Sequence, residues 1–285
     1  MTRAPAGLGS GDEPLARRRF DSKRLYAAIV FVPLFYVLVR YLPPQAFFGL
    51  IFVSGLIVAG EFYRLYFRDR DRVAASAVGI AGTGALLISL QWPEIVPERI
   101  VLLATVMAAL ASRLSTGRIS ESLTDAAVIV LGVLYAGFML GHLLLTRGLP
   151  HGEFLIFFVV LVTWAGDTGA YYAGLLFGRT QLAPTVSPNK TVEGLVGGLF
   201  LATLAAALGR AWFLPAFNLA DVVICGVLLT LVGVVGDLSE SAMKRSAGVK
   251  DSGGLIPAHG GMLDRLDSML FTAPTFYYYV TLVKG

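Results

Sequence analysis

Long runs of apolar residues, separated by short polar stretches, dominate the pattern along the chain. A membrane-spanning helix needs about 20 predominantly apolar residues to cross the hydrocarbon core. Nine runs approach that length, and we expect a helix in each: Leu25–Leu42, Ala46–Tyr66, Val73–Trp92, Ile100–Leu114, Thr124–Leu145, Phe154–Phe177, Val192–Leu214, Leu219–Gly236 and Leu266–Val283. The pattern therefore predicts an all-α, polytopic membrane protein with about nine transmembrane helices.

Composition agrees with this interpretation and argues against a soluble globular domain. Of the 285 residues, 56% are hydrophobic and 15% charged, and the mean hydropathy is +0.72, whereas soluble domains have about 25% charged residues. The formal net charge is +4, but the basic residues cluster between the apolar runs. This distribution is typical of orientation in a membrane and does not indicate nucleic-acid binding. The only cysteine, Cys225, can form no intrachain disulfide.

Basic residues also predict the orientation of the chain. Residues 1–24 are polar, and we interpret them as a disordered basic tail that precedes an uncleaved anchor, because no signal-peptide cleavage pattern follows. Arg and Lys at the end of this tail place the N-terminus in the cytoplasm. Alternating nine spans from there puts the later basic clusters in cytoplasmic loops. We expect residues 25–150 to form scaffold helices and residues 151–285 to form the catalytic membrane domain.

One carboxylate lies well inside an apolar run. Asp167 is in the sixth run, where an acid costs about 3 kcal/mol unless it faces water, a cavity or a partner. We expect a functional role for Asp167, with a structural ion pair as the alternative. Small residues recur at every fourth position of the same run, which lets another helix approach closely, and we interpret them as packing positions: Gly166, Ala170, Gly174 and Gly178.

The loop after this run carries groups that suit a phosphate. It reads Ser187-Pro-Asn-Lys-Thr-Val-Glu-Gly194 and leads directly into the seventh run. Free backbone N–H groups at a helix start attract phosphate, and Lys190 adds positive charge. Thr191 can equally serve only as the cap of the following helix. By itself, this loop is a weak indication of a binding site.

The richest polar stretch is residues 236–267. If the eighth helix continues into it, Asp237, Ser241 and Lys244 fall at positions i, i+4 and i+7, on one face. Such a face can hold an acid and a base against one ligand.

Two further acids, Asp264 and Asp267, are three residues apart at the start of the ninth run and can share a face. Carboxylates are the oxygen ligands that Mg²⁺ prefers together with substrate phosphates, and Lys and Arg neutralise phosphate oxygens. This mixture of acidic and basic residues indicates a site that binds a metal-bridged polyphosphate. A charge network that binds anionic lipid head groups is the alternative, but it would not explain why acids gather in this stretch.

The complete stretch resembles the signature of the phosphatidate cytidylyltransferase (CDP-diacylglycerol synthase) family. The resemblance lies in Ser241-x-Met-Lys-Arg, four residues, Lys250-Asp, then Gly253 and Ile256-Pro-x-His-Gly-Gly-Met-x-Asp264-Arg-Leu-Asp267. Shorter blocks around Asp167 and residues 187–194 are also similar to the family. The likeness covers the chain from about Phe154 to its end.

This resemblance implies an all-helical enzyme of the inner (plasma) membrane that converts CTP and phosphatidic acid into CDP-diacylglycerol and pyrophosphate. It implies Mg²⁺, a second, monovalent cation such as K⁺, homodimers, contact with membrane lipids, and an active site on the cytoplasmic side. By matched position it implies catalytic Asp237, Asp264, Lys244, Arg245, Lys250 and Arg265; substrate-binding Ser187, Asn189, Lys190, Thr191, Ser241, His259, Gly260 and Gly261; and the metal ligands Asp237, Asp264, Asp267 and Asp167.

Three alternatives stay open at this level. His259 can assist proton movement or only hydrogen-bond the backbone of its Gly-rich turn. A CTP-dependent lipid kinase would use similar groups but transfer the γ-phosphate. A transporter would also explain Asp167, although the polar residues gather at one membrane face and the chain has no internal inverted repeat.

Overall fold

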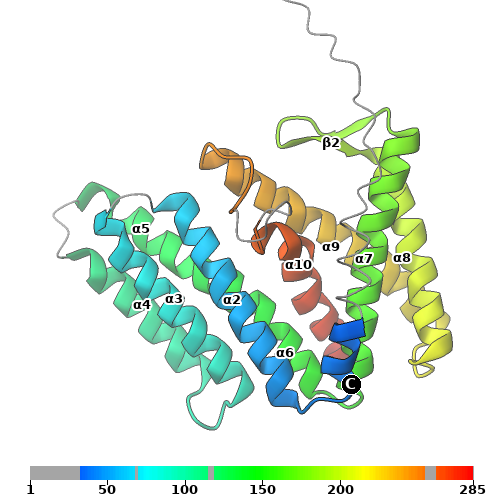
Figure 1. Cartoon of the computed structure of the whole chain (residues 1–285), viewed down its shortest axis with the longest axis horizontal. Coiled ribbons are helices and arrows are strands. Elements are labelled where there is room, and N and C mark those ends of the chain that lie inside the picture. Colours follow the sequence, from blue (N-terminus) through cyan, green and yellow to red (C-terminus); the bar gives the residue numbers. More distant parts are fainter. Residues whose placement is uncertain (1–32, 68–69, 115–118, 254–260, 285) are drawn as a thin grey trace, which may run out of the picture.

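The computed structural model describes residues 33–67, 70–114, 119–253 and 261–284, and these are almost entirely helical (Figure 1). A short helix covers residues 33–40. The remaining helical segments, of which η1 and η2 are π-helical, are α2 (Pro44–Tyr66), α3 (Arg70–Gln91), α4 (Glu98–Leu114), α5 (Ile119–Gly132), η1 (Val133–Met139), α6 (Leu140–Gly148), α7 (Gly152–Phe177), α8 (Val192–Trp212), α9 (Leu219–Ser246), α10 (Leu263–Tyr279) and η2 (Val280–Lys284).

The all-α membrane architecture expected from the sequence is confirmed. Each of the nine predicted runs coincides at least in part with helix in the described residues. Within those residues, six helices are long and apolar enough to cross a membrane. The 17 residues of α4 and the 17 of α10 fall short of that length, so the count of nine spans stays a prediction.

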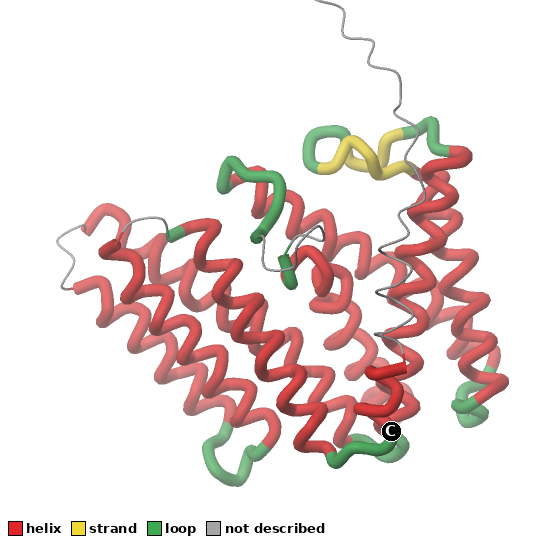
Figure 2. Tube along the Cα trace, in the orientation of Figure 1, coloured by secondary structure: helices red, strands yellow, loops and turns green. Residues whose placement is uncertain are grey.

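A short β-hairpin interrupts the helices between α7 and α8. Strand β1 (Gln181–Ala183) pairs antiparallel with β2 (Ser187–Thr191), and the two project from one end of the bundle (Figure 2). We expected only a loop over the residues of β2. Thr191 then caps α8, because its Oγ1 accepts a hydrogen bond of 3.1 Å from the backbone N–H of Gly194.

Small residues bring α7 and α8 into close contact, as their spacing predicts. A Cβ atom on Gly198 would lie 2.9 Å from the carbonyl oxygen of Gly166, and one on Gly194 would lie 2.8 Å from that of Ala170. Larger residues at these positions would push the helices apart. The packing interpretation of the sequence spacing is therefore confirmed.

Helix α10 lies between the helices of the two halves of the chain (Figure 1). It contacts α2, α6 and η1 on one side and α7 and α9 on the other. Phe276 of α10 stacks on Phe158 of α7 with ring centroids 5.6 Å apart, and both belong to the same buried core as Phe62 of α2. A continuous core therefore joins the described residues of the segments 25–150 and 151–285, and the functional division at residue 150 stays a prediction.

Candidate functional site

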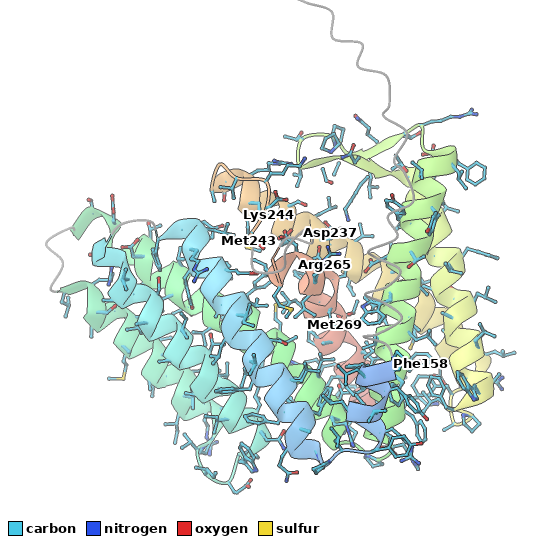
Figure 3. The ribbon with its side chains drawn as sticks, in the orientation of Figure 1. Phe158, Asp237, Met243, Lys244, Arg265 and Met269 are labelled. Carbon is cyan, nitrogen blue, oxygen red and sulfur yellow. The ribbon has the colours of Figure 1, made fainter. Side chains whose placement is uncertain are left out.

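Polar side chains gather at the C-terminal end of α9 and the N-terminal end of α10. Helix α9 continues beyond the apolar run as far as Ser246, which confirms the expectation that Asp237, Ser241 and Lys244 follow one another along it. Ser241 Oγ donates a hydrogen bond of 3.4 Å to Asp237 Oδ1. Figure 3 shows Asp237, Lys244 and Arg265 near this end of the two helices, with the apolar side chains of Met269 and Phe158 farther along the bundle.

The β-hairpin is joined to α9 by an ion pair between Lys190 and Asp237. The two side chains are 22% and 33% exposed, so solvent and ligands can reach both. The hairpin therefore brings a cation from the α7–α8 connection to the polar end of α9, a contact that the local sequence pattern does not specify.

Two more carboxylates belong to the same group. Ser268 links them, because its Oγ donates to Asp167 Oδ1 at 3.3 Å and its backbone N–H donates to Asp267 Oδ1 at 2.7 Å. Both acids interact electrostatically with Asp237 and with Lys190. We name Asp167, Asp237 and Asp267 the acidic cluster. Three different helices, α7, α9 and α10, supply its members.

A glycine allows α9 and α10 to cross closely at this cluster. A Cβ atom on Gly236 would lie 2.5 Å from the carbonyl oxygen of Asp267, closer than carbon and oxygen atoms can approach without displacement. The absent side chain thus permits the approach of the helix segments that carry Asp237 and Asp267.

Asp264 has a different environment from the acidic cluster. Its Oδ1 lies 2.6 Å from Lys244 Nζ, while its Oδ2 accepts from the Ser252 hydroxyl at 2.9 Å and from the backbone N–H groups of Ser252 at 3.2 Å and Gly261 at 2.9 Å. Burial alone would raise the pKa of Asp264, but its hydrogen bonds and the charge of Lys244 hold that pKa below its usual range. Both carboxylate oxygens of Asp264 therefore contact protein groups.

The acidic cluster has the donor chemistry that Mg²⁺ requires. Carboxylate oxygens are hard ligands, and Mg²⁺ is commonly held by one or two of them together with substrate phosphates. Among the described residues, no three acidic, histidine or cysteine side chains already converge into a complete metal site. The expected Mg²⁺ site therefore stays a prediction.

The other predicted site residues lie around this group. Ser187 and Asn189 are on β2, and Arg245, Lys250 and Arg265 are exposed at the same end of α9 and α10. Gly261 contributes a backbone donor to Asp264. His259 and Gly260 lie outside the described residues.

Two buried acids take part in this arrangement without having been predicted. Glu240 is 1% exposed, and its Oε2 lies 2.6 Å from Lys244 Nζ. Glu61 is 3% exposed and accepts hydrogen bonds from the backbone of α10. The sequence offered a signal for each, because Glu240 precedes Lys244 by one helical turn and Glu61 interrupts the apolar run of α2.

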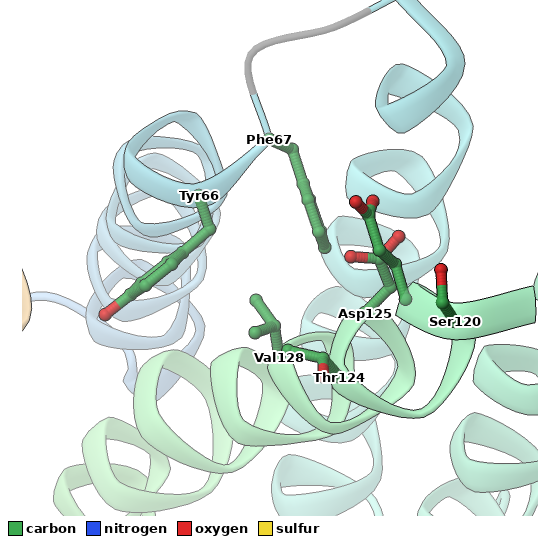
Figure 4. Close-up of a pocket in the computed structure, with 7 residues that line it drawn as sticks. Tyr66, Phe67, Ser120, Thr124, Asp125 and Val128 are labelled. Carbon is green, nitrogen blue, oxygen red and sulfur yellow. The ribbon is translucent and has the colours of Figure 1, made fainter. Parts of the chain in front are cut away.

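A pocket lies elsewhere, between the end of α2 and the beginning of α5 (Figure 4). It is lined by Tyr66, Phe67, Ser120, Glu121, Thr124, Asp125 and Val128. Asp125 pairs with the buried Arg113 at 3.3 Å. These residues include no member of the acidic cluster, so we do not assign this pocket to the same site.

Comparison with known proteins gives consistent matches. The family model described as "Cytidylyltransferase family" matches residues 22–283. A phosphatidate cytidylyltransferase of Staphylococcus aureus (strain COL) is 37% identical over 202 residues, which cover 68% of this chain and 75% of the relative. Proteins of the same name from Haemophilus influenzae and Synechocystis sp. are 44% identical over 133 residues (45% of this chain, 46% of the relative) and 48% identical over 136 residues (47% and 45%).

Proposed function

The chain belongs to the cytidylyltransferase family, and on that premise we propose that its acidic cluster is where CMP passes from CTP to phosphatidic acid. The chain is a nucleotidyltransferase of phospholipid biosynthesis that forms CDP-diacylglycerol. The observation that carries the assignment of the site is the Lys190–Asp237 ion pair beside Asp167 and Asp267. This arrangement combines carboxylates that can bind a metal with a lysine that can bind phosphate, at one end of the bundle.

The reaction needs little proton transfer. A phosphate oxygen of phosphatidic acid attacks the α-phosphorus of CTP, and the new P–O bond forms as the bond to pyrophosphate breaks. The second pKa of a phosphate monoester is about 6, so the nucleophile is already largely dianionic at neutral pH. The protein therefore acts mainly by positioning the two substrates and neutralising their charge.

Lys190 and Lys244 are held in place for that task by carboxylates. Lys190 contacts Asp237, and Lys244 Nζ lies 2.6 Å from both Asp264 and Glu240. Because each ammonium group is fixed before substrate binds, less side-chain entropy is lost on phosphate binding. The exposed Arg245, Lys250 and Arg265 provide further positive charge for the triphosphate and the lipid phosphate.

Asp237, Asp267 and Asp167 would hold Mg²⁺ in this proposal. The ion would supply charge neutralisation at the phosphates of CTP. Asp264 would be a further ligand through Oδ1, beside its contact with Lys244, just as Asp237 would bind the ion beside its contacts with Lys190 and Ser241. Asp264 also positions Lys244 and α10. The second, monovalent cation and the homodimer stay predictions.

We further propose that the end of the bundle with the β-hairpin faces the cytoplasm. The supporting observation is the concentration of Lys190, Lys244, Arg245 and Lys250 at that end, in agreement with the tendency of cytoplasmic segments to carry basic residues. We also propose the inner membrane as the location of the protein.

Doubly labelled CTP tests the reaction. Detergent-purified protein is incubated with phosphatidic acid, Mg²⁺ and CTP that carries one label in cytidine and another in the γ-phosphate. We expect the cytidine label in the lipid and the γ label in released pyrophosphate. Transfer of the γ label to lipid would instead identify a lipid kinase and refute cytidylyl transfer.

A further inference from the structure

Glu61 of α2 contacts the start of α10 from a distant part of the chain. Its Oε1 accepts a hydrogen bond of 3.0 Å from the backbone N–H of Met262, and its Oε2 accepts one of 2.8 Å from that of Leu263. The hydroxyl of Ser252 lies 3.4 Å from the same Oε2. One buried carboxylate thus joins both described ends of the signature stretch, on either side of residues 254–260.

Helix α10 depends on this contact for its N-terminal cap. The residue at its own N-cap position, Met262, makes no side-chain cap hydrogen bond. The first N–H groups of a helix need acceptors, and a negative charge beside them is stabilised by the helix dipole. Glu61 meets both requirements from 201 residues away in sequence.

The packing around Glu61 leaves its carboxylate little freedom. Glu61 is only 3% exposed. Moving a buried carboxylate away from its hydrogen-bond donors costs free energy. A Cβ atom on Gly253 would lie 3.0 Å from Glu61 Oε1, and one on Gly261 would lie 2.5 Å from Oε2. The two glycines therefore leave the space that the carboxylate occupies.

The backbone N–H groups that Glu61 binds come just before Asp264 and Asp267 in the chain. Asp264 follows the bonded Leu263 directly, and Asp267 lies one turn farther along α10. Asp264 contacts Lys244, and Asp267 belongs to the acidic cluster. A shift of the first turn of α10 would therefore displace both carboxylates relative to α9.

We propose that Glu61 is a positioning residue for nucleotidyl transfer: it holds the first turn of α10 so that Asp264 and Asp267 meet Lys244 and Asp237. The proposal rests on the proposed function of that site. It gives the N-terminal half of the chain a part in positioning the site, beyond its packing role.

Glu61→Gln tests the proposal, with Asp221→Asn as the matched control. Asp221 is also 3% exposed and also accepts a backbone N–H, from Asn218 at 2.6 Å, together with the hydroxyl of Tyr279 at 2.6 Å. In addition it pairs with Lys284 at 3.0 Å. It lies at the beginning of α9, at the opposite end of that helix from Lys244. Both substitutions remove one charge from a buried, hydrogen-bonded carboxylate.

We expect Glu61→Gln to lower kcat by about tenfold or more, since a displacement of about 1 Å in a catalytic group can cost about a hundredfold. KM for CTP and for phosphatidic acid should stay near the wild-type values. Hydrogen exchange should accelerate at the amides of Met262 and Leu263. Asp221→Asn also removes the charge that pairs with Lys284, so it should lower the thermal midpoint at least as much but leave kcat unchanged.

Two outcomes would overturn the proposal. One is a kcat of Glu61→Gln equal to that of wild type at a lowered thermal midpoint, which would make Glu61 purely structural. The other is an equal fall of kcat in both variants. If Glu61→Gln does not fold, Glu61→Asp carries the same test, because it keeps the charge but withdraws it by one methylene. Product analysis of the wild type tests the proposed function separately.

Discussion

Lys244 Nζ lies 2.6 Å from Asp264 Oδ1, and this contact ties the end of α9 to the start of α10. The same ammonium group lies 2.6 Å from Glu240 Oε2. Lys244 therefore contacts two acidic side chains in a partly buried environment and offsets the repulsion between them. The relationship makes Lys244 important for stability as well as for phosphate binding.

Replacing Lys244 should destabilise the protein more than replacing Lys190. Lys244→Met leaves Glu240 and Asp264 without their cation, and breaking a buried ion pair in this way costs about 3 kcal/mol. Lys190→Met removes a more exposed pair, with side chains 22% and 33% exposed, for which about 0–1 kcal/mol is expected. Thermal unfolding in the same detergent measures the difference. Equal losses in the two variants would contradict the central role assigned to Lys244.

Asp237 and Asp264 should respond differently to removal of their charge. We expect Asp237→Asn to lower turnover by about a hundredfold or more with little change in thermal midpoint, because the ion pair with Lys190 and the hydroxyl of Ser241 are its described contacts. Asp264→Asn should lower both turnover and stability, since both of its oxygens are bonded to the protein.

Metal binding provides a readout of the Asp237 prediction that is independent of activity. Chelation with EDTA should abolish wild-type turnover, and added Mg²⁺ should restore it. Binding of Mn²⁺, followed by electron paramagnetic resonance, should be weaker in Asp237→Asn than in Lys190→Met. Unchanged Mn²⁺ affinity in Asp237→Asn would remove Asp237 from the proposed ligands.

Two glycines of α9 provide a matched test of the helix crossing. A Cβ atom on Gly236 would lie 2.5 Å from the carbonyl oxygen of Asp267, whereas one on Gly233 would lie 3.5 Å from Thr272 Cγ2, an ordinary contact. We expect Gly236→Ala to separate α9 from α10 and lower turnover by about tenfold or more. Gly233→Ala should keep wild-type turnover. Alanine has a higher helix propensity than glycine, so this substitution should stabilise α9. Similar turnover in the two variants would show that the close crossing is dispensable.

Single-cysteine labelling tests the proposed orientation. Cys225 is 1% exposed, and Cys225→Ala provides the background. Thr185→Cys lies between β1 and β2, and Ala216→Cys lies between α8 and α9; both positions are exposed. A membrane-impermeant maleimide should label position 216 in intact cells and position 185 only after the membrane is opened. The reverse pattern would place the acidic cluster on the outer side.

Much of the fold could be predicted because its signals are local. Apolar runs of spanning length locate the helices, since hydropathy acts on each segment separately. The helical period placed Asp237, Ser241 and Lys244 along one helix, and α9 does continue to Ser246. The hairpin of β2 escaped prediction, because its residues Ser187–Thr191 include a proline and have little strand preference.

The sequence by itself determined the family and a set of candidate site residues. The spacing from Ser241 to Asp267 and the match over residues 22–283 identify the family without coordinates. Residue type and local spacing are sufficient for this, because the acids and bases needed for phosphoryl chemistry are visible in the chain itself.

Only the tertiary structure decided how these residues are paired. It joins Lys190 to Asp237, engages Asp264 with Lys244, and brings Glu61 to the amide of Leu263 across 202 positions of the chain. Such partners depend on where helices cross, and a crossing is set by the shapes of two distant surfaces and by small residues such as Gly236. A local pattern contains no information about which distant surface it will meet.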